Sequence, residues 1–188
     1  MIVVRSARNT DASKIASVHV ETWKEAYAGL LDGGFLDSMT ASRMTRHWRK
    51  ALDEKRSNLD DAIFVAATEK DVVGFVTISA CRDVFAPWEA EITMLYVLDE
   101  YRGAGIGRAL MKSAADHALA RGMFSGGLWV LRDNLHARGF YEALGGDRCG
   151  RKMDTVGGRS VPLVGYSWSE VASLAERAIP QPFRISKH

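Results

Sequence analysis

A short glycine-rich segment between a predicted strand and a predicted helix constrains this chain most strongly. Residues 102–107 read Arg-Gly-Ala-Gly-Ile-Gly, follow a strand-like stretch at 91–97 and run into a helix-like stretch at 106–121. Glycines let the backbone come close to a bulky ligand, and a helix start offers unpaired N–H groups with partial positive charge. Arg102 and Arg108 add full positive charges. The segment therefore predicts a pocket for phosphate oxygens, rather than a turn that only caps a helix.

Two other phosphate-binding loops fit this segment poorly. A P-loop ends in Gly-Lys-Ser/Thr, which is missing here, and a dinucleotide-binding fold needs the spacing GxGxxG with an acidic residue on a second strand. The glycines of residues 103–107 fall as GxGxG instead. Both classes are disfavoured.

Hydrophobic periodicity predicts a mixed α/β chain around this segment. We expect strands at residues 2–4, 63–67, 72–81, 90–98 and 128–131, helices from residue 10 or 11 to about 29 and at 42–52, 106–121 and 135–144, and a closing hairpin around Gly157-Gly158. This order predicts a mostly antiparallel sheet with helices on both faces. One central pair of neighbouring parallel strands is expected, joined by the crossover helix 106–121.

The length indicates one domain. A chain of 188 residues, 47% hydrophobic, can bury one substantial core, and we expect it to span residues 1–168. Residues 169–188 are expected to be a tail that forms a short helix up to about residue 179 and is then disordered.

Charge and cysteine use exclude several function classes. The formal net charge is +2, with Lys and Arg spread along the chain, so we expect no nucleic-acid partner. No stretch reaches the roughly 20 apolar residues that cross a bilayer, so no membrane association is expected. Cys81 and Cys149 are far apart, and neither they nor the histidines have metal-ligand spacing, so a reducing cytoplasm and no metal are expected. A homodimer is left open.

A second motif lies downstream. Residues 134–145 read Asn-Leu-His-Ala-Arg-Gly-Phe-Tyr-Glu-Ala-Leu-Gly, which resembles the Asn-x-x-Ala-x-x-Phe-Tyr-Glu-x-x-Gly element of the GNAT (Gcn5-related N-acetyltransferase) superfamily. Residues 102–107 match Arg-x-x-Gly-x-Gly, the coenzyme A pyrophosphate loop of the same superfamily. Two matched motifs are far more specific than one.

The resemblance implies the GNAT fold and an acetyl-CoA-dependent transferase that acetylates a primary amine directly. It implies that strand 91–97 splays from strand 128–131 and that the backbone of Leu95, Tyr96 and Val97 pairs with the pantetheine arm. Asn134 would contact the pantetheine or the adjacent chain, and Tyr141 would face the thioester sulfur. The pyrophosphate would be held by Arg102, Gly103, Ala104, Gly105, Ile106, Gly107 and Arg108.

Acetyl transfer needs a base and an acid. An amine of pKa about 10.4 is protonated at neutral pH and must lose a proton before it attacks a thioester. Glu91 is the candidate base, because the histone-acetyltransferase branch of the superfamily has its glutamate at the same offset from the loop. The alternatives are a water relay, the weaker rival Glu89, or an ordinary ion pair for Glu91. Tyr141 is the candidate acid for the departing thiolate, unless it only packs in the core, and the N–H of Leu95 would meet the oxyanion.

The acceptor is harder to identify from sequence. Superfamily members usually line the acceptor site with the first helices and the last hairpin, which implies Trp23, Glu25, Tyr27 and a loop at 29–37. The rings and carboxylate could hold a cationic amine, or they could simply pack and be solvated. Residues 22–31 are similar to openings of bacterial small-molecule members, including polyamine acetyltransferases. A small amine is therefore expected; a protein lysine or N-terminal amine, or a non-catalytic acetyl-CoA sensor, is the alternative.

Overall fold

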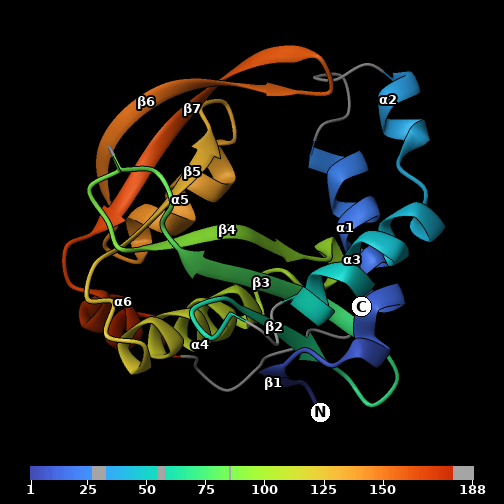
Figure 1. The fold of residues 1–188 in the computed structure, drawn as a ribbon, viewed down its shortest axis with the longest axis horizontal. Helices are drawn as coiled ribbons and strands as arrows, with labels where there is room; N and C mark the ends of the chain where they lie inside the picture. The colour runs from blue at the N-terminus through green and yellow to red at the C-terminus, as the bar shows by residue number, and fades with distance from the viewer. Residues whose placement is uncertain (27–32, 55–57, 85, 180–188) are drawn as a thin grey trace.

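The structure is a computed structural model that describes residues 1–26, 33–54, 58–84 and 86–179 (Figure 1). Its strands are β1 (Val3–Ser6), β2 (Ala62–Ala67), β3 (Val72–Ala80), β4 (Ala90–Val97), β5 (Gly126–Leu131), β6 (Asp147–Val156) and β7 (Arg159–Trp168). Its helices are α1 (Ala12–Ala26), α2 (Gly33–Ser38), α3 (Ala41–Glu54), α4 (Ile106–Ala120), α5 (Leu135–Ala143) and α6 (Val171–Arg177), with short 3₁₀ turns at η1 (Asn9–Asp11) and η2 (Asp99–Tyr101).

The strands form one sheet in the order β1-β2-β3-β4-β5-β7-β6. Every neighbouring pair is antiparallel except β4 and β5, which are parallel. Those two strands pair only at Ala90 with Gly126 and at Glu91 with Gly127, and beyond that point they separate. The fold class expected from the sequence is therefore confirmed, including the splayed central pair.

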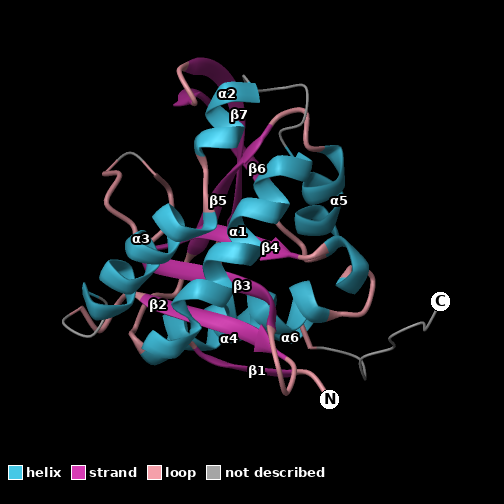
Figure 2. Ribbon diagram, turned by 90° about the vertical axis from the view of Figure 1, so that its right-hand side faces the viewer, coloured by secondary structure: helices cyan, strands magenta, loops and turns pink. Residues whose placement is uncertain are grey.

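Each face of the sheet packs against its own set of helices (Figure 2) and carries its own apolar core. α1 and α3 cover one face, where Ile15 and Phe75 are fully buried. α4 and α6 cover the other, where Leu110 and Leu174 are buried together with residues of α5. Helices thus lie on both faces, as the alternation of elements predicts.

The sequence pattern of α4 explains its place. Its buried residues include Ile106, Leu110, Ala114 and Ala118, spaced by four, so they form one stripe facing the sheet. The helix ends as predicted before Gly122, whose φ of +74° is the left-handed conformation that glycine adopts without strain. α4 is thereby held as the crossover that joins the two central strands.

A β-bulge in β4 changes which face its later side chains occupy. Ile78 of β3 pairs with Ile92, but the preceding Thr77 pairs with Met94, so Thr93 is an extra residue. Beyond the bulge, Met94 and Tyr96 pack into the core under α1 and α3, while Glu91 and Thr93 border a hollow where β4 leaves β5.

Two segments differ from what the sequence predicts, and two further predictions concern residues that the structure does not describe. Residues 33–38 were expected within a loop but form α2, and β5 begins two residues earlier than expected. The expected helix end near residue 29 and the disorder expected at the C-terminal end lie outside the described residues. The short helix expected in the tail is present as α6, and it packs in the main core against α4.

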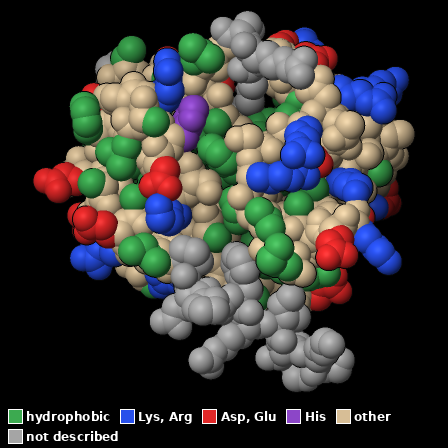
Figure 3. Space-filling model, turned by 90° about the horizontal axis from the view of Figure 1, so that it is seen from below, with side chains coloured by type: hydrophobic (Ala, Val, Ile, Leu, Met, Phe, Trp, Pro, Cys, Tyr) green, Lys and Arg blue, Asp and Glu red, His purple; other side chains and the backbone are tan. Residues whose placement is uncertain are grey.

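On the face seen from below, basic and acidic side chains are interspersed (Figure 3). Among the helices within the described ranges, none is long and apolar enough to span a lipid bilayer.

Candidate active site

The glycine-rich loop has the backbone geometry that its sequence predicts. Gly103 and Gly105 have φ of +73° and +83°, a region that other residues enter only at a cost, and Gly105 directly precedes α4. The first intrahelical bond runs from the N–H of Ala109 to the carbonyl of Gly105. The amides of the preceding first turn therefore have no intrahelical acceptor and can bind an anion.

Gly107 also makes a close contact inside the protein. A Cβ at this position would lie 3.2 Å from the ring of Phe140, so the missing side chain lets the start of α4 pack closely on α5. The close approach is to the protein's own aromatic ring. Gly107 thus joins the two sequence motifs to each other.

The two arginines at the loop are already bonded. Arg102 donates to the Asp99 carboxylate at 2.6 Å and to the Glu25 carboxylate at 3.3 Å. Arg108 donates to the main-chain carbonyl of Arg177 at 2.8 Å, at the end of α6. Both side chains therefore already have hydrogen-bond acceptors within the protein, although Arg102 remains partly exposed.

The inner edge of β4 is open where the pantetheine arm is expected. Leu95, Tyr96 and Val97 pair with β3 on one side. On the other side, pairing with β5 ends at Glu91, so among the described residues no strand covers this edge. An extended chain could add to it as a strand does. The side chains of Leu95 and Val97 pack toward α4, whereas that of Tyr96 packs toward α1.

Tyr141 lies on α5 in an aromatic cluster behind the splay. Its side chain is 7% exposed and contacts the rings of Phe140, Tyr166 and Trp168. Burial alone raises its pKa well above the ordinary 10.0, because the phenolate would be poorly solvated, and no hydrogen bond joins its hydroxyl to the described residues. The phenol therefore keeps its proton at any ordinary pH, which an acid catalyst requires.

Asn134 caps α5. Its side-chain oxygen accepts a hydrogen bond from the N–H of Ala137 at 3.0 Å. The amide nitrogen of Asn134 is not used in this contact, so the expected contact with a ligand remains compatible with the capping role.

Glu91 borders a hollow at the point where the strands separate. The hollow has a volume of about 300 Å³ and is lined by Asp61, Ser79, Ala80, Arg82, Glu91 and Thr93. Ser79 and Glu91 are register partners on neighbouring strands, which places their side chains side by side on one face. The hollow therefore offers two carboxylates and two hydroxyls beside the end of β4–β5 pairing.

The rival Glu89 is engaged elsewhere. Its carboxylate accepts hydrogen bonds from the backbone N–H groups of Phe124 at 2.6 Å and Ser125 at 3.1 Å. These bonds lower the pKa of Glu89, since they stabilise its charged form. Glu89 thus fixes the turn that leads into β5.

Cys81 stands beside Glu91. Its thiol donates to the Glu91 carboxylate at 3.6 Å and to the carbonyl of Asp83. Burial, followed by the neighbouring carboxylates, raises the pKa of Cys81. A thiol that stays protonated is a poor nucleophile, so the contact disfavours Cys81 as an acetyl carrier.

Trp88 covers the base of the splay and was missed from the sequence. A Cβ on Gly127 would lie 2.1 Å from the indole of Trp88, so the ring lies directly on that glycine. Gly127 is the register partner of Glu91, and the neighbouring ring on this face is Trp129, with centroids 5.5 Å apart. The signal was the Gly126-Gly127 pair in a strand, which marks a close approach.

The last turns of α1 lie against β4. Trp23 donates through its indole N–H to the hydroxyl of Tyr96 at 2.9 Å, and the ring of His19 stacks on Tyr96. Burial, with a smaller effect of His47, lowers the pKa of His19 to about 4. Trp23 and Glu25 are thus brought near the cofactor strand, whereas Tyr27 lies outside the described residues.

Over the described part of the chain, no group of three or more His, Cys, Asp or Glu side chains is placed to hold a metal ion.

Comparison with known proteins identifies the family. The acetyltransferase (GNAT) family matches residues 16–146, which include the loop, the splayed strands and α5. The chain belongs to this family. The resemblance drawn from residues 102–107 and 134–145 is therefore confirmed.

Individual relatives extend the similarity over most of the chain. An uncharacterized N-acetyltransferase, YuaI of Bacillus subtilis, is 29% identical over 175 residues, covering 93% of this chain and 96% of the relative. A spermidine N(1)-acetyltransferase of Thermoplasma acidophilum is 27% identical over 143 residues, covering 74% of this chain and 84% of the relative. The solved PaiA N-acetyltransferase of Thermoplasma acidophilum, in complex with coenzyme A, shares the fold with a TM-score of 0.68 at 23% identity, covering 87% of this chain and 98% of that chain.

Proposed function

We propose that this GNAT-family acetyltransferase moves the acetyl group of acetyl-CoA directly onto the primary amine of a small molecule. The observation that carries the proposal is the separation of β4 from β5 immediately after Glu91 and Gly127. The separation lies between an amide-rich loop at one end and a carboxylate-lined hollow at the other. A long thiol cofactor and a cationic acceptor would thus meet at one point.

The residues present fit coenzyme A. The open edge of β4 at Leu95, Tyr96 and Val97 would pair with the amides of the pantetheine arm. The amides of residues 103–108 would bind the pyrophosphate at the start of α4. Bound acetyl-CoA supplies the activated acetyl group as a thioester; the chain's own side chains handle the protons.

Two side chains would move those protons. The amine nitrogen forms a bond to the acetyl carbon and gives its proton to Glu91, directly or through water. As the carbon–sulfur bond breaks, Tyr141 donates its proton to the leaving sulfur and recovers one from solvent. The raised pKa of Tyr141 keeps it in the donating form.

The dimensions of the hollow favour a small acceptor. Its volume of about 300 Å³ lies at the lower end of the usual range for small-molecule pockets. Arg82, which also lines the hollow, pairs with Asp61 at 3.7 Å, so Glu91 leaves the lining with one net negative charge, suited to an ammonium group. The similarity to a spermidine N(1)-acetyltransferase supports the same substrate class. Acetylation of a protein lysine or N-terminal amine is the second candidate and predicts turnover of peptides.

A panel of acceptors tests the proposal. Purified protein is mixed with acetyl-CoA and with monoamines, diamines, polyamines or lysine peptides, and thiol release is followed. We expect turnover of small amines well above that of peptides. Saturable coenzyme A binding by calorimetry with no turnover of any amine would instead indicate a sensor, and no binding heat would remove the assignment of the loop.

Direct transfer has its own test. A Cys81→Ala variant should retain turnover, because no acetyl-enzyme is formed. Loss of turnover together with acetylation of Cys81 in the wild type, seen by mass spectrometry, would show a covalent pathway.

A further inference from the structure

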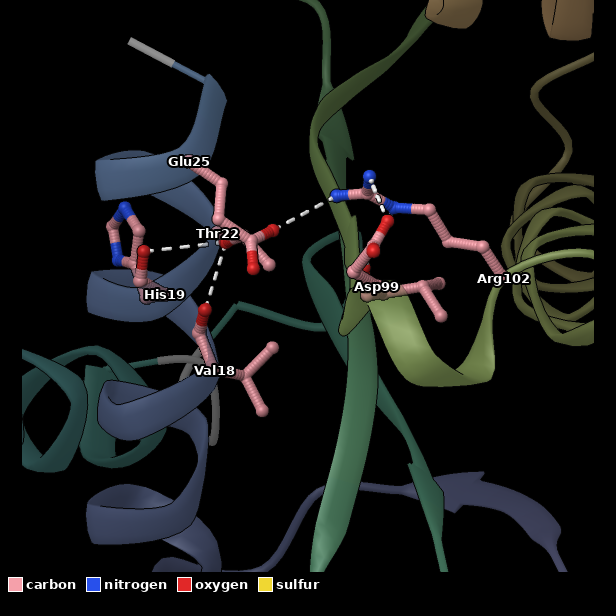
Figure 4. Close-up of polar contacts among 7 residues, drawn as sticks. Val18, His19, Thr22, Glu25, Asp99 and Arg102 are labelled. Carbon is pink, nitrogen blue, oxygen red and sulfur yellow. Dashed lines mark hydrogen bonds and ion pairs between the residues drawn. The ribbon is translucent and has the colours of Figure 1, made fainter. Parts of the chain in front are cut away.

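The guanidinium of Arg102 turns away from the loop that it begins. It bonds to Asp99 at 2.6 Å and to Glu25 of α1 at 3.3 Å (Figure 4). Its Nε also donates to the carbonyl of Val97 at 3.4 Å. Asp99 belongs to the turn after β4, and Val97 is the last residue of β4. The side chain therefore joins the end of α1 to the end of the cofactor strand.

The end of α1 is fixed to β4 at a second point. The indole N–H of Trp23 donates to the hydroxyl of Tyr96 at 2.9 Å. One residue before Trp23, the hydroxyl of Thr22 bonds back to the carbonyls of Val18 at 2.7 Å and His19 at 3.2 Å (Figure 4). The last two turns of α1, expected to line the acceptor site, thus carry two separate contacts to the strand expected to pair with the cofactor.

The charges around Arg102 argue against a direct phosphate contact. Two carboxylates already share its single positive charge, so this cluster has a formal charge of −1. A diphosphate that approached this cluster would be attracted less strongly than by an unpaired guanidinium, because the two carboxylates would repel it. The neutral backbone amides of the loop carry no such penalty.

We propose that Arg102 is a positioning residue that couples the acceptor helix to the cofactor strand through Glu25, and that it does not bind the diphosphate. The inference rests on the proposed function, because it concerns how the two substrate sites of that reaction communicate. It also gives Glu25 a role as the partner of Arg102, in place of a contact to the acceptor's cation.

Two acetyl donors separate this role from a phosphate ligand. Acetyl-CoA carries the diphosphate, whereas acetylpantetheine lacks it. Arg102→Gln should lower kcat/KM for both donors by the same factor, about 2- to 5-fold, since the ion pair is partly exposed and modest in strength. A phosphate ligand would instead give a loss of about 10-fold or more with acetyl-CoA alone, as a charged hydrogen bond does.

Three variants complete the test. Glu25→Gln should reproduce the effect of Arg102→Gln, and the double variant should be no worse than either single one, because the same contact is lost. The exchanged pair, Glu25→Arg with Arg102→Glu, should recover part of the loss. Asp99→Asn is the matched control: it removes the local carboxylate and leaves the contact to α1, so the acceptor KM should not change.

Each outcome decides between the roles. An acetyl-CoA-specific loss in Arg102→Gln, or independent and additive effects of Glu25 and Arg102, would overturn the proposal. If Arg102→Gln were poorly folded by thermal unfolding, Arg102→Lys serves instead: it keeps the charge but not the forked geometry, so the same loss with both donors is expected. Failure of wild-type protein to turn over any amine would count against the proposed function, whereas coenzyme A calorimetry on the same variants would still test the diphosphate contact.

Discussion

Replacing Tyr141 with Phe should separate activity from stability. The hydroxyl has no hydrogen-bond partner among the described residues, and its ring is held by neighbouring aromatic side chains. Removal of the hydroxyl therefore leaves the packing intact and sacrifices no internal bond, so the free energy of unfolding in urea should be unchanged or slightly higher. Turnover should fall by about 10² to 10⁴, the usual contribution of a positioned acid, or roughly 3 to 5 kcal/mol of barrier.

Tyr166 provides the matched control for this experiment. Its hydroxyl donates to Glu142 at 2.5 Å and accepts from Arg138 at 3.3 Å, within the same aromatic cluster. Tyr166→Phe should cost about 1 to 3 kcal/mol of stability, because a hydrogen bond to a charged group is lost, while turnover changes little. Thiol release and urea unfolding are measured on both variants. Unchanged turnover in Tyr141→Phe, or a large loss of coenzyme A affinity, would refute the role of Tyr141 as an acid.

Three further substitutions test other parts of the site. Glu91→Gln should depress turnover most at low pH, where the amine is protonated and needs a base, and a pH profile identical to the wild type would remove Glu91 from the mechanism. Gly127→Ala should lower the free energy of unfolding in urea by about 3 kcal/mol or more, because its Cβ would lie 2.1 Å from the ring of Trp88. Gly139→Ala in α5, where a Cβ would have nothing within 4 Å, should raise that free energy by up to roughly 1 kcal/mol. Equal effects of the two substitutions would contradict the packing described. His19 has a pKa of about 4 in the folded protein against an ordinary 6.5, so its contribution to stability is complete above pH 6.5 and is lost, by about 3 kcal/mol at most, as the pH falls toward 4. His19→Gln should therefore weaken the loss of stability between pH 6.5 and 4. An unchanged loss over that range would show that other groups cause it.

The fold was largely predictable because its local signals agree with its tertiary structure. The stripe of Ile106, Leu110 and Ala114 defines α4, and the hairpin of β2 and β3 follows from two β-branched runs around a polar turn. The sequence does not predict α2, because a six-residue helix that begins Gly-Gly has weak intrinsic helix propensity.

The candidate site was predictable only where chemistry is local in sequence. A sequence can indicate the positive φ of Gly103 and Gly105, because glycine adopts this conformation without strain. The surroundings of Glu91 depend on register, which brings Ser79 beside it, and on the turn that lays Trp88 over Gly127. The partner of Arg102 lies 77 residues away in the chain, so no spacing in the sequence could have indicated that pair.

Within the described ranges, no strand pairs with the inner edge of β4 beyond Glu91, which leaves hydrogen-bonding groups of a central strand open to another chain. Exposed strand edges invite intermolecular pairing, so empty protein should be the form most prone to aggregate. A ligand that occupies the edge would also stabilise the native state by mass action, by about 2.7 kcal/mol at a hundredfold excess over its Kd. Storage with coenzyme A should thus lengthen the useful life of the purified enzyme.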